Sequence, residues 1–312
     1  MRICSLQPGA TEIIAALGLT DHLVALSHEC DYPPTITGLP VVTRSFTAPA
    51  PSSCREIDRS VAERMAADQP LFEIDAASLA AANPDLIILQ DLCHICGIAP
   101  DHLDQTLSGL PARPTLITVG GSTLEAVFHD IVRIGQAVGR TETAESLIDA
   151  LRRRLEAVRQ RQAGRARPPK VVCLEWLDPF YVAGHWTPEL VALAGGRDVL
   201  GTAGAPSRKV EWHDLVAASP DLLLIMPCGF TLERTVDEFD SHCPAFPWDQ
   251  LPAVHHRRVF ALDGNAYFSR PGPRLIDGLE ILEALLTEED LVAPLPPGAR
   301  RITKVPAQSL KV

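Results

Sequence analysis

The sequence predicts an α/β protein of two lobes, with mostly parallel sheets and one long helix between them. Short apolar runs alternate with helix-length amphipathic segments along the chain, the order typical of parallel βαβ units. The chain has 312 residues, more than a single hydrophobic core usually serves. Its two halves also share a segment, because residues 81–89 resemble residues 217–225. Each copy reads as a helix end, a proline and a buried strand.

Composition and charge exclude several classes of protein. Apolar residues make up 46% of the chain, and 39 acidic against 28 basic residues give a net charge of −11. That charge gives no general attraction to nucleic acid or to an anionic membrane surface. No run of about 18 apolar residues indicates a helix inserted in a membrane. Residues 2–6 read as a strand rather than a signal peptide, so a cytoplasmic location with reduced cysteines is predicted.

The N-terminal lobe is expected to span residues 1–140. Near-continuous apolar runs predict strands that are covered on both faces, and amphipathic patterns between them predict helices. Strands are expected at 3–6, 23–27, 85–89 and 116–119, and helices at 11–17, 78–82 and 122–138. Ser122 is expected to cap the last of these helices. Residues 43–75 lack the pattern and are predicted to be an irregular insertion.

Residues 141–169 are predicted to form the bridging helix and its linker. Apolar residues recur there at three- and four-residue spacing, and the arginines of the opposite face are interpreted as a solvated surface. A helix of about 23 residues would be roughly 35 Å long. The C-terminal lobe is expected at 170–290, followed by a tail at 291–312. Its strands are expected at 170–175, 222–226 and 259–262, and a helix at 188–194.

Several segments resemble the cobalamin- and siderophore-binding proteins that serve ABC importers, most closely the cobalamin type. The segments are Arg2–Glu12, Leu17–Gly18, Asp31–Pro34, Asn83–Asp85, Ser219–Asp221 and Arg270–Arg274. The resemblance covers about residues 2–287. It implies two Rossmann-like lobes bridged by one helix, which is the helical-backbone periplasmic-binding-protein fold. It also implies a corrinoid ligand.

Two departures from that family argue against docking on an importer. Importer proteins of the family are secreted, and this chain shows no export signal. They also present one glutamate per lobe to the membrane partner, and the corresponding positions here are near Ala77 and His213. Neither residue is acidic, although Asp75 and Asp214 lie close by in the sequence.

Loops that follow the predicted strands are expected to line a cleft between the lobes. Free helix N–H groups within residues 7–11 are expected to meet an anionic group there. Aromatic residues are few but gather in these loops, which favours a flat, largely apolar macrocycle such as a corrinoid or related metal chelate. A histidine would supply an axial imidazole to the metal. The predicted ligand-binding residues are His28, Asp31, Tyr32, Asp91, His94, Trp176, Phe180, His185, Trp186, Tyr267, Phe268 and Arg270.

Cysteines in the same loops support a different class of function. Cys93 and Cys96 form a C-x-x-C pair, and Cys30 and Cys228 also follow strands. These four residues are candidate ligands for zinc or an iron–sulfur cluster. The alternative function is therefore a cytoplasmic metalloprotein that performs redox or sulfur chemistry. The same cysteines also fit packed small hydrophobes or a redox-active pair.

The chain lacks the motifs of common hydrolases, phosphate-binding loops and metalloproteases. A cysteine beside a histidine remains the one candidate nucleophile. The sequence therefore favours a binding protein over an enzyme. A third reading is an importer component that reaches the periplasm by an unusual route.

Overall fold

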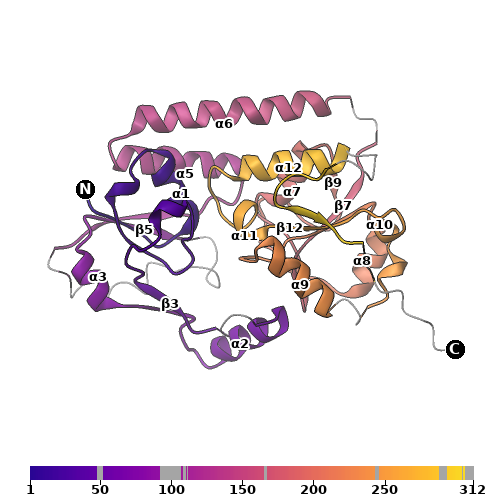
Figure 1. Ribbon diagram of the computed structural model, residues 1–312, viewed down its shortest axis with the longest axis horizontal. Coiled ribbons are helices and arrows are strands. Elements are labelled where there is room, and N and C mark those ends of the chain that lie inside the picture. Colours follow the sequence, from indigo (N-terminus) through magenta and orange to yellow (C-terminus); the bar gives the residue numbers. More distant parts are fainter. Residues whose placement is uncertain are drawn as a thin grey trace. The chain divides into compact units, whose positions relative to one another are not determined.

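The structure is a computed structural model that describes residues 1–47, 52–91, 107, 110, 112–164, 167–242, 246–287, 294–303 and 305. The chain divides into two compact units, each with its own sheet (Figure 1). Unit 1 comprises Met1–Ser52, Arg59–Leu151 and Pro271–Pro273. Unit 2 comprises Ser53–Asp58, Arg152–Arg270 and Arg274–Val312. The predicted α/β class is confirmed.

Unit 1 is built on a fully parallel four-stranded sheet of order β2-β1-β5-β6. The strands are β1 (Ile3–Ser5), β2 (Leu23–Leu26), β5 (Leu86–Gln90) and β6 (Thr115–Val119). Every residue of β1 and β5 is buried, as expected for strands covered on both faces. The carboxyl ends of the four strands therefore lie along one edge of the sheet.

The helices of unit 1 cover this sheet. They are α1 (Pro8–Ala16), α3 (Ala76–Ala82) and α5 (Leu124–Ala137), with short 3-10 turns η1 (Thr20–His22) and η2 (Pro34–Ile36). Helix α1 packs against α5, and α3 packs against β2. The side chain of Thr123, rather than the expected Ser122, caps α5 by accepting a hydrogen bond from the Ala126 N–H.

The predicted insertion has regular structure. Strands β3 (Thr43–Ser45) and β4 (Phe72–Ile74) pair antiparallel, and α2 (Cys54–Ala66) lies between them in the chain. The expectation of an irregular segment is therefore wrong. Of the residues of helix α2, only Cys54 is fully buried. The first turn of α2, up to Asp58, belongs to unit 2, whereas the rest of the helix from Arg59 onward belongs to unit 1.

Unit 2 has a mixed sheet of order β10-β8-β7-β11-β12-β13, with β9 also paired to β7. Its strands are β7 (Lys170–Leu177), β8 (Phe180–Val182), β9 (Arg197–Asp198), β10 (Arg208–Lys209), β11 (Leu222–Ile225), β12 (Val259–Leu262) and β13 (Ala299–Arg301). The central strands β7, β11 and β12 are parallel, whereas β8, β10 and β13 add antiparallel. The parallel strands again end at a common edge.

Two helical layers enclose the sheet of unit 2. The helices are α7 (Thr187–Leu193), α8 (Trp212–Ala218), α9 (Leu232–His242), η5 (Trp248–Gln250), α10 (Pro252–His255), α11 (Gly264–Tyr267) and α12 (Leu275–Thr287). Helices α7 and α12 pack against each other. One core cluster joins apolar residues of β7, β11 and β12 to Leu215, Phe239 and Trp248.

The sequence echo between the two halves corresponds to the same local structure in each unit. Helices α3 and α8 end at Asn83 and Ser219, which both adopt the left-handed conformation that closes a helix. After each proline, an aspartate accepts the backbone N–H at the start of the first strand of its unit. Asp85 Oδ2 lies 2.7 Å from Arg2 N, and Asp221 Oδ2 lies 2.8 Å from Lys170 N.

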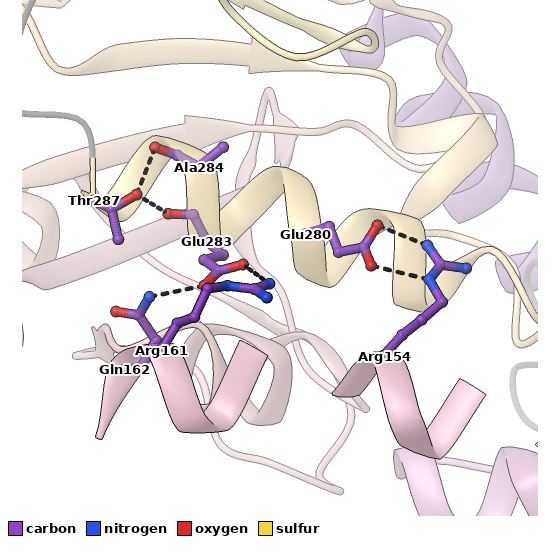
Figure 2. Close-up of polar contacts among 7 residues, drawn as sticks. All are labelled: Arg154, Arg161, Gln162, Glu280, Glu283, Ala284 and Thr287. Atoms are coloured by element: carbon purple, nitrogen blue, oxygen red, sulfur yellow. Dashed lines mark hydrogen bonds and ion pairs between the residues drawn. The ribbon is translucent and has the colours of Figure 1, made fainter. Parts of the chain in front are cut away.

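Helix α6 (Thr141–Gln162) is the predicted bridging helix. Its residues up to Leu151 belong to unit 1, and those from Arg152 belong to unit 2. Within unit 2, Arg154 and Arg161 each form a two-pronged ion pair with a carboxylate of α12, as Figure 2 shows. Hydrogen bonds from Arg161 lower the pKa of Glu283, a side chain that is only 11% exposed. These two arginines remain partly exposed to solvent, as predicted, and they also fasten the helix to α12.

None of the helices in the described part of the chain combines the length and apolar character needed to cross a membrane.

Candidate functional site

The carboxyl edge of the sheet in unit 1 carries a small polar cluster around Cys30. The Thr11 hydroxyl lies 2.8 Å from Ser5 Oγ and 3.1 Å from Cys30 Sγ. Ser27 Oγ lies 3.5 Å from the same sulfur. Helix α1, the last residue of β1 and the loop after β2 supply these groups, because parallel strands end at one edge. The thiol is partly buried and sits among hydroxyl groups.

His28 is held beside this cluster by the insertion. Its Nδ1 lies 2.7 Å from Thr43 Oγ1, which also accepts the His28 backbone N–H at 2.9 Å. Its ring lies against Phe72, with centroids 5.7 Å apart. The Nε2 atom is buried and lies 3.3 Å from Glu29 Oε1 without hydrogen-bond geometry. Strands β3 and β4 therefore orient the predicted imidazole.

The other predicted residues of unit 1 lie near the same edge. Asp31 and Tyr32 follow β2 and are exposed, and the side chain of Tyr32 is among the few large apolar groups left in contact with solvent. Asp91 directly follows β5, and its backbone N–H donates to Val119 O. His94 falls outside the described residues.

The first turn of α1 has no open anion site at its first amides. The Gln7 side chain accepts the Ala10 N–H, and Pro8 has no N–H to offer. Gly9 is covered by the backbone of Pro271, because a Cβ at Gly9 would lie 2.3 Å from that carbonyl oxygen. The sequence expectation of free N–H groups is therefore wrong at Ala10, where a local side chain already satisfies the donor.

The carboxyl edge of unit 2 carries Trp176, Cys228 and Tyr267. Trp176 is the second-last residue of β7, and its partly buried ring packs edge-on against Phe230 with centroids 5.5 Å apart. Cys228 follows β11, and its backbone N–H donates to Glu175 O. Tyr267 ends α11, directly after β12. The parallel pairing of β7, β11 and β12 brings these three loops to one edge, as the sequence indicates.

Three of the predicted aromatic residues are instead core side chains. Phe180, Trp186 and Phe268 are each 5% exposed or less. Phe180 packs among the rings of Trp212, Phe246 and Trp248. The Trp186 indole N–H donates to Phe268 O at 2.8 Å, which satisfies its polar group inside the unit. Their rings stabilise unit 2, and their contact with a ligand stays a prediction.

His185 follows an antiparallel strand, β8, rather than a parallel strand of the sheet. Strand β8 runs antiparallel to β7, with Val182 opposite Leu174, so the chain returns toward the amino ends before it reaches His185. Burial lowers the pKa of His185, and its Nδ1 is buried without a hydrogen-bond partner. The sequence missed this because a two-residue hairpin turn, Asp178–Pro179, follows β7 in place of a crossover.

Arg270 is a buried cation close to the carboxyl edge of unit 2. It is 5% exposed, and its Nη2 donates to Asn265 Oδ1 at 2.6 Å. Asn265 belongs to α11, and the backbone N–H of Asn265 donates to Phe230 O. The side chain thus joins the loop after β12 to the segment that precedes α12.

The cysteines divide into two groups by burial. Cys4, Cys54 and Cys173 are fully buried, and burial raises the pKa of each thiol, so they act as small apolar side chains. Cys30 and Cys228 are partly exposed. Cys93 and Cys96 lie outside the described residues. Within the residues that are described, no three His, Cys, Asp or Glu side chains are arranged to hold a metal ion.

The positions that correspond to importer docking lie at the starts of α3 and α8. Asp75 caps α3 by accepting the N–H groups of Ala77 and Ser78 at 3.0 Å. In α8, Asp214 accepts the Glu211 N–H at 2.9 Å and lies 3.3 Å from His213 Nε2. Both neighbouring aspartates therefore have capping roles in their own helices.

One contributor to the edge of unit 2 could not be predicted from its neighbours in the sequence. Residues 53–58, from the insertion, lie in unit 2, where the Cys54 carbonyl oxygen accepts the Trp176 indole N–H at 3.2 Å. The only local signal is the pattern Ser53-x-x-Glu56, which marks a helix start. The surface against which the start of α2 packs depends on contacts with residues distant in the sequence.

Comparison with known proteins gives a family. The sequence profile described as "Periplasmic binding protein" matches residues 3–266, most of the chain. The chain belongs to the periplasmic binding protein family. A vitamin B12-binding protein of Vibrio cholerae serotype O1 is 26% identical over 283 residues, which cover 89% of this chain and 86% of that protein. A vitamin B12-binding protein of Yersinia pestis is 25% identical over 281 residues, covering 88% and 82%.

Solved structures of this periplasmic binding protein fold are also similar. The periplasmic heme-binding protein RhuT from Roseiflexus sp. RS-1, in apo form, has a TM-score of 0.68 and 25% identity, covering 91% of this chain and 97% of its own. A periplasmic heme-binding protein from Pseudomonas aeruginosa has a TM-score of 0.72 at 19% identity, covering 98% and 99%. The predicted two-lobed binding-protein fold is thus confirmed.

The predicted cytoplasmic location is wrong. The related proteins of known structure, including RhuT and the vitamin B12-binding protein BtuF of Vibrio cholerae, are periplasmic. The prediction rested on the N-terminal residues alone, and the relatives that match along nearly the whole chain outweigh it.

Proposed function

We propose that this protein binds a macrocyclic metal chelate, specifically a corrinoid such as cobalamin, and carries it in the periplasm. The observation that carries the proposal is the match to vitamin B12-binding relatives along 89% of the chain. Heme is the competing ligand, because RhuT, at a similar identity, is a heme-binding protein. Both ligands are broad, largely apolar rings with polar edges, so one set of aromatic side chains suits either.

The aromatic residues that remain available at the carboxyl edges narrow the ligand-contacting set. Tyr32 is 40% exposed in unit 1, and Trp176 and Tyr267 are partly exposed in unit 2. We propose these three side chains as the main contacts with the faces of the ring. Each combines a large apolar surface with a polar tip that tolerates the boundary between ligand and water.

His28 is the proposed source of an axial imidazole among the described histidines. The insertion fixes its ring through Thr43 and Phe72, and Nε2 points away from the Thr43 hydroxyl because Nδ1 makes that contact. A histidine whose one nitrogen is held by a neighbour presents the other in a defined direction, which is how imidazoles serve metals.

Titration of the purified chain with cyanocobalamin and, separately, with hemin tests the proposal, with binding followed by visible absorbance and by calorimetry. Saturable binding of cobalamin is expected. Tyr32→Ala and Trp176→Ala are each expected to weaken it by about fivefold, the equivalent of about 1 kcal/mol for a lost aromatic contact. Binding of hemin alone would replace the corrinoid assignment with heme. Binding of neither ring would overturn the proposed function.

The role of His28 has its own readout. Hemin bound to the wild-type protein is expected to show the spectrum of a histidine-ligated iron, and hydroxocobalamin is expected to show the spectral shift that follows when an imidazole replaces its bound water. His28→Ala is expected to abolish both changes. An unchanged spectrum in His28→Ala would show that another group supplies the axial ligand.

A further inference from the structure

The inserted segment contributes a turn to unit 2 at the place where Trp176 stands. Ser53–Asp58 belongs to unit 2 although the chain on either side of it belongs to unit 1. Cys54 is fully buried in the core cluster that contains Leu174, Leu177 and Phe230. The turn is therefore an integral part of this unit.

A chain of two hydrogen bonds connects Trp176 to a buried carboxylate through that turn. The indole N–H of Trp176 donates to Cys54 O at 3.2 Å, and the backbone N–H of Cys54 donates to Glu238 Oε1 at 2.8 Å. Glu238 belongs to α9 and is 7% exposed. A single residue of backbone thus receives the indole on one side and is anchored by a carboxylate on the other.

Two features make the anchor strong. Cys54 is the first residue of α2, so its N–H has no partner within the helix and lies at the positive end of the helix dipole. A carboxylate is the acceptor best suited to that position, and hydrogen bonds to charged acceptors are stronger than those between neutral groups. Glu238 therefore fixes the position of the Cys54 carbonyl that receives the indole.

The rest of the turn is fixed by contacts of its own. Ser53 and Glu56 exchange hydrogen bonds across the helix start, at 2.9 Å and 3.3 Å from backbone N–H to side-chain oxygen. Arg55 Nε lies 2.7 Å from Asp178 Oδ2, in the hairpin turn that follows β7. The turn that carries the Cys54 carbonyl is thus held by hydrogen bonds within itself and by one ion pair to the hairpin of unit 2.

We infer that Glu238 is a positioning residue for ligand binding, which orients the ring of Trp176 through the backbone of Cys54. This inference rests on the proposed function, because it assumes that the ring of Trp176 contacts the ligand. The indole is held by the hydrogen bond to Cys54, by the edge-on contact with Phe230 and by packing against the core cluster of unit 2, and among these the hydrogen bond is the directional one. Loss of the first leaves the ring free to turn about its side-chain bonds, and a ring that is not held in place must be ordered when ligand binds.

The test is a double-mutant cycle between Glu238 and Trp176, using cyanocobalamin and hemin as probes. Glu238→Ala is expected to weaken binding by at least about fivefold when Trp176 is present. The same substitution in a Trp176→Phe protein is expected to have no effect, because phenylalanine has no N–H to be oriented. Glu238→Gln keeps an acceptor oxygen and is expected to restore most of the affinity. Equal losses in both backgrounds would overturn the inference.

A measurement without ligand keeps the test independent of the proposed function. In a protein labelled with nitrogen-15 at tryptophan, the indole signal of Trp176 is identified by its disappearance in Trp176→Phe. That signal is expected to shift in Glu238→Ala and to return toward its wild-type position in Glu238→Gln. An unmoved signal would overturn the inference even if ligand binds, whereas shifted signals in a protein that binds neither ring would leave the hydrogen-bond relay intact and refute the proposed function.

Circular dichroism and thermal unfolding check that each variant is folded. If Glu238→Ala does not fold, Glu238→Asp replaces it. The shorter side chain withdraws the carboxylate from Cys54 by about one bond length while preserving its charge, so the same indole shift and a smaller loss of affinity are expected. No shift and no loss in Glu238→Asp, with Glu238→Ala unfolded, would count against the relay.

Discussion

Arg154 is expected to be a main stabilising residue of unit 2. It reaches from α6 to α12, where its Nε and Nη2 lie 2.9 Å and 2.7 Å from the two carboxylate oxygens of Glu280. The same Nη2 lies 2.5 Å from Asp277 Oδ1. Arg154→Ala removes all three contacts and leaves two carboxylates one helical turn apart without their shared cation. We expect this substitution to destabilise unit 2 measurably.

The size of the loss follows from geometry and exposure. Exposed ion pairs are usually worth about 0.2–1 kcal/mol, and values near the upper end require a two-pronged arrangement or a network. Arg154 has both, but its side chain is 40% exposed and those of Asp277 and Glu280 are 37% and 41% exposed, so water screens the attraction. We therefore expect a loss of about 1–1.5 kcal/mol in the free energy of unfolding.

Urea unfolding followed by tryptophan fluorescence measures this loss in the relevant unit. All four tryptophans belong to unit 2, and urea adds no ionic strength. Arg153→Ala is the matched control, because Arg153 is the exposed neighbour on the same helix. In 1 M NaCl the difference between the two variants is expected to shrink, since the screening length falls to about 3 Å. Equal stabilities of the two variants, or a difference insensitive to salt, would refute the reasoning.

Two further predictions concern Gly9 and the cysteines. Gly9→Ala is expected to lower the thermal midpoint, because its Cβ would lie 2.3 Å from Pro271 O, whereas helix propensity alone predicts a gain of about 0.5–1 kcal/mol; an unchanged or raised midpoint would contradict the close approach. Iodoacetamide at pH 8 is expected to alkylate Cys30 and Cys228 in the native protein and to spare Cys54, whose pKa is raised by burial. Peptide mass spectrometry measures this, and modification of Cys54 at the rate of Cys30 would show that its burial is wrong.

Most of the parallel framework could be predicted from sequence because local signals specify it. The segments around Asn83 and Ser219 contain a helix end, a proline and an apolar run, and both become a helix, a left-handed cap and a buried strand. Strand β12 has the predicted bounds, because a four-residue apolar run between polar residues leaves no alternative register. Helix α6 has 22 residues, close to the length of about 23 residues predicted from its apolar stripe.

The details that failed depend on contacts distant in sequence. The direction of β8 is set by pairing with β7, so the position of His185 could not be read from its own neighbours. Trp186 and Phe268 resemble exposed loop aromatics in sequence. In the structure both side chains are buried, and the Trp186 indole N–H donates to the Phe268 carbonyl oxygen. Arginines of α6 that read as a solvated face meet acidic residues of α12 more than 120 positions later. Trp176 lies near the end of β7 and Tyr267 follows β12, so the parallel pairing of these strands with β11 accounts for their place at the edge, while their contact with a ligand stays a prediction.

The path of the chain between the two units has a consequence for how the protein is made. Unit 2 needs Ser53–Asp58, which leave the ribosome long before its first strand, and unit 1 needs Pro271–Pro273, which arrive near the end of synthesis. Neither unit is complete when the other half of the chain is missing, so N-terminal folding during translation stops short of the native state. A fragment cut at Arg152 would lack Cys54 and leave a hole in its own core. We therefore expect an exchange of lobes between relatives to need both of these short segments to be carried with the unit that they complete.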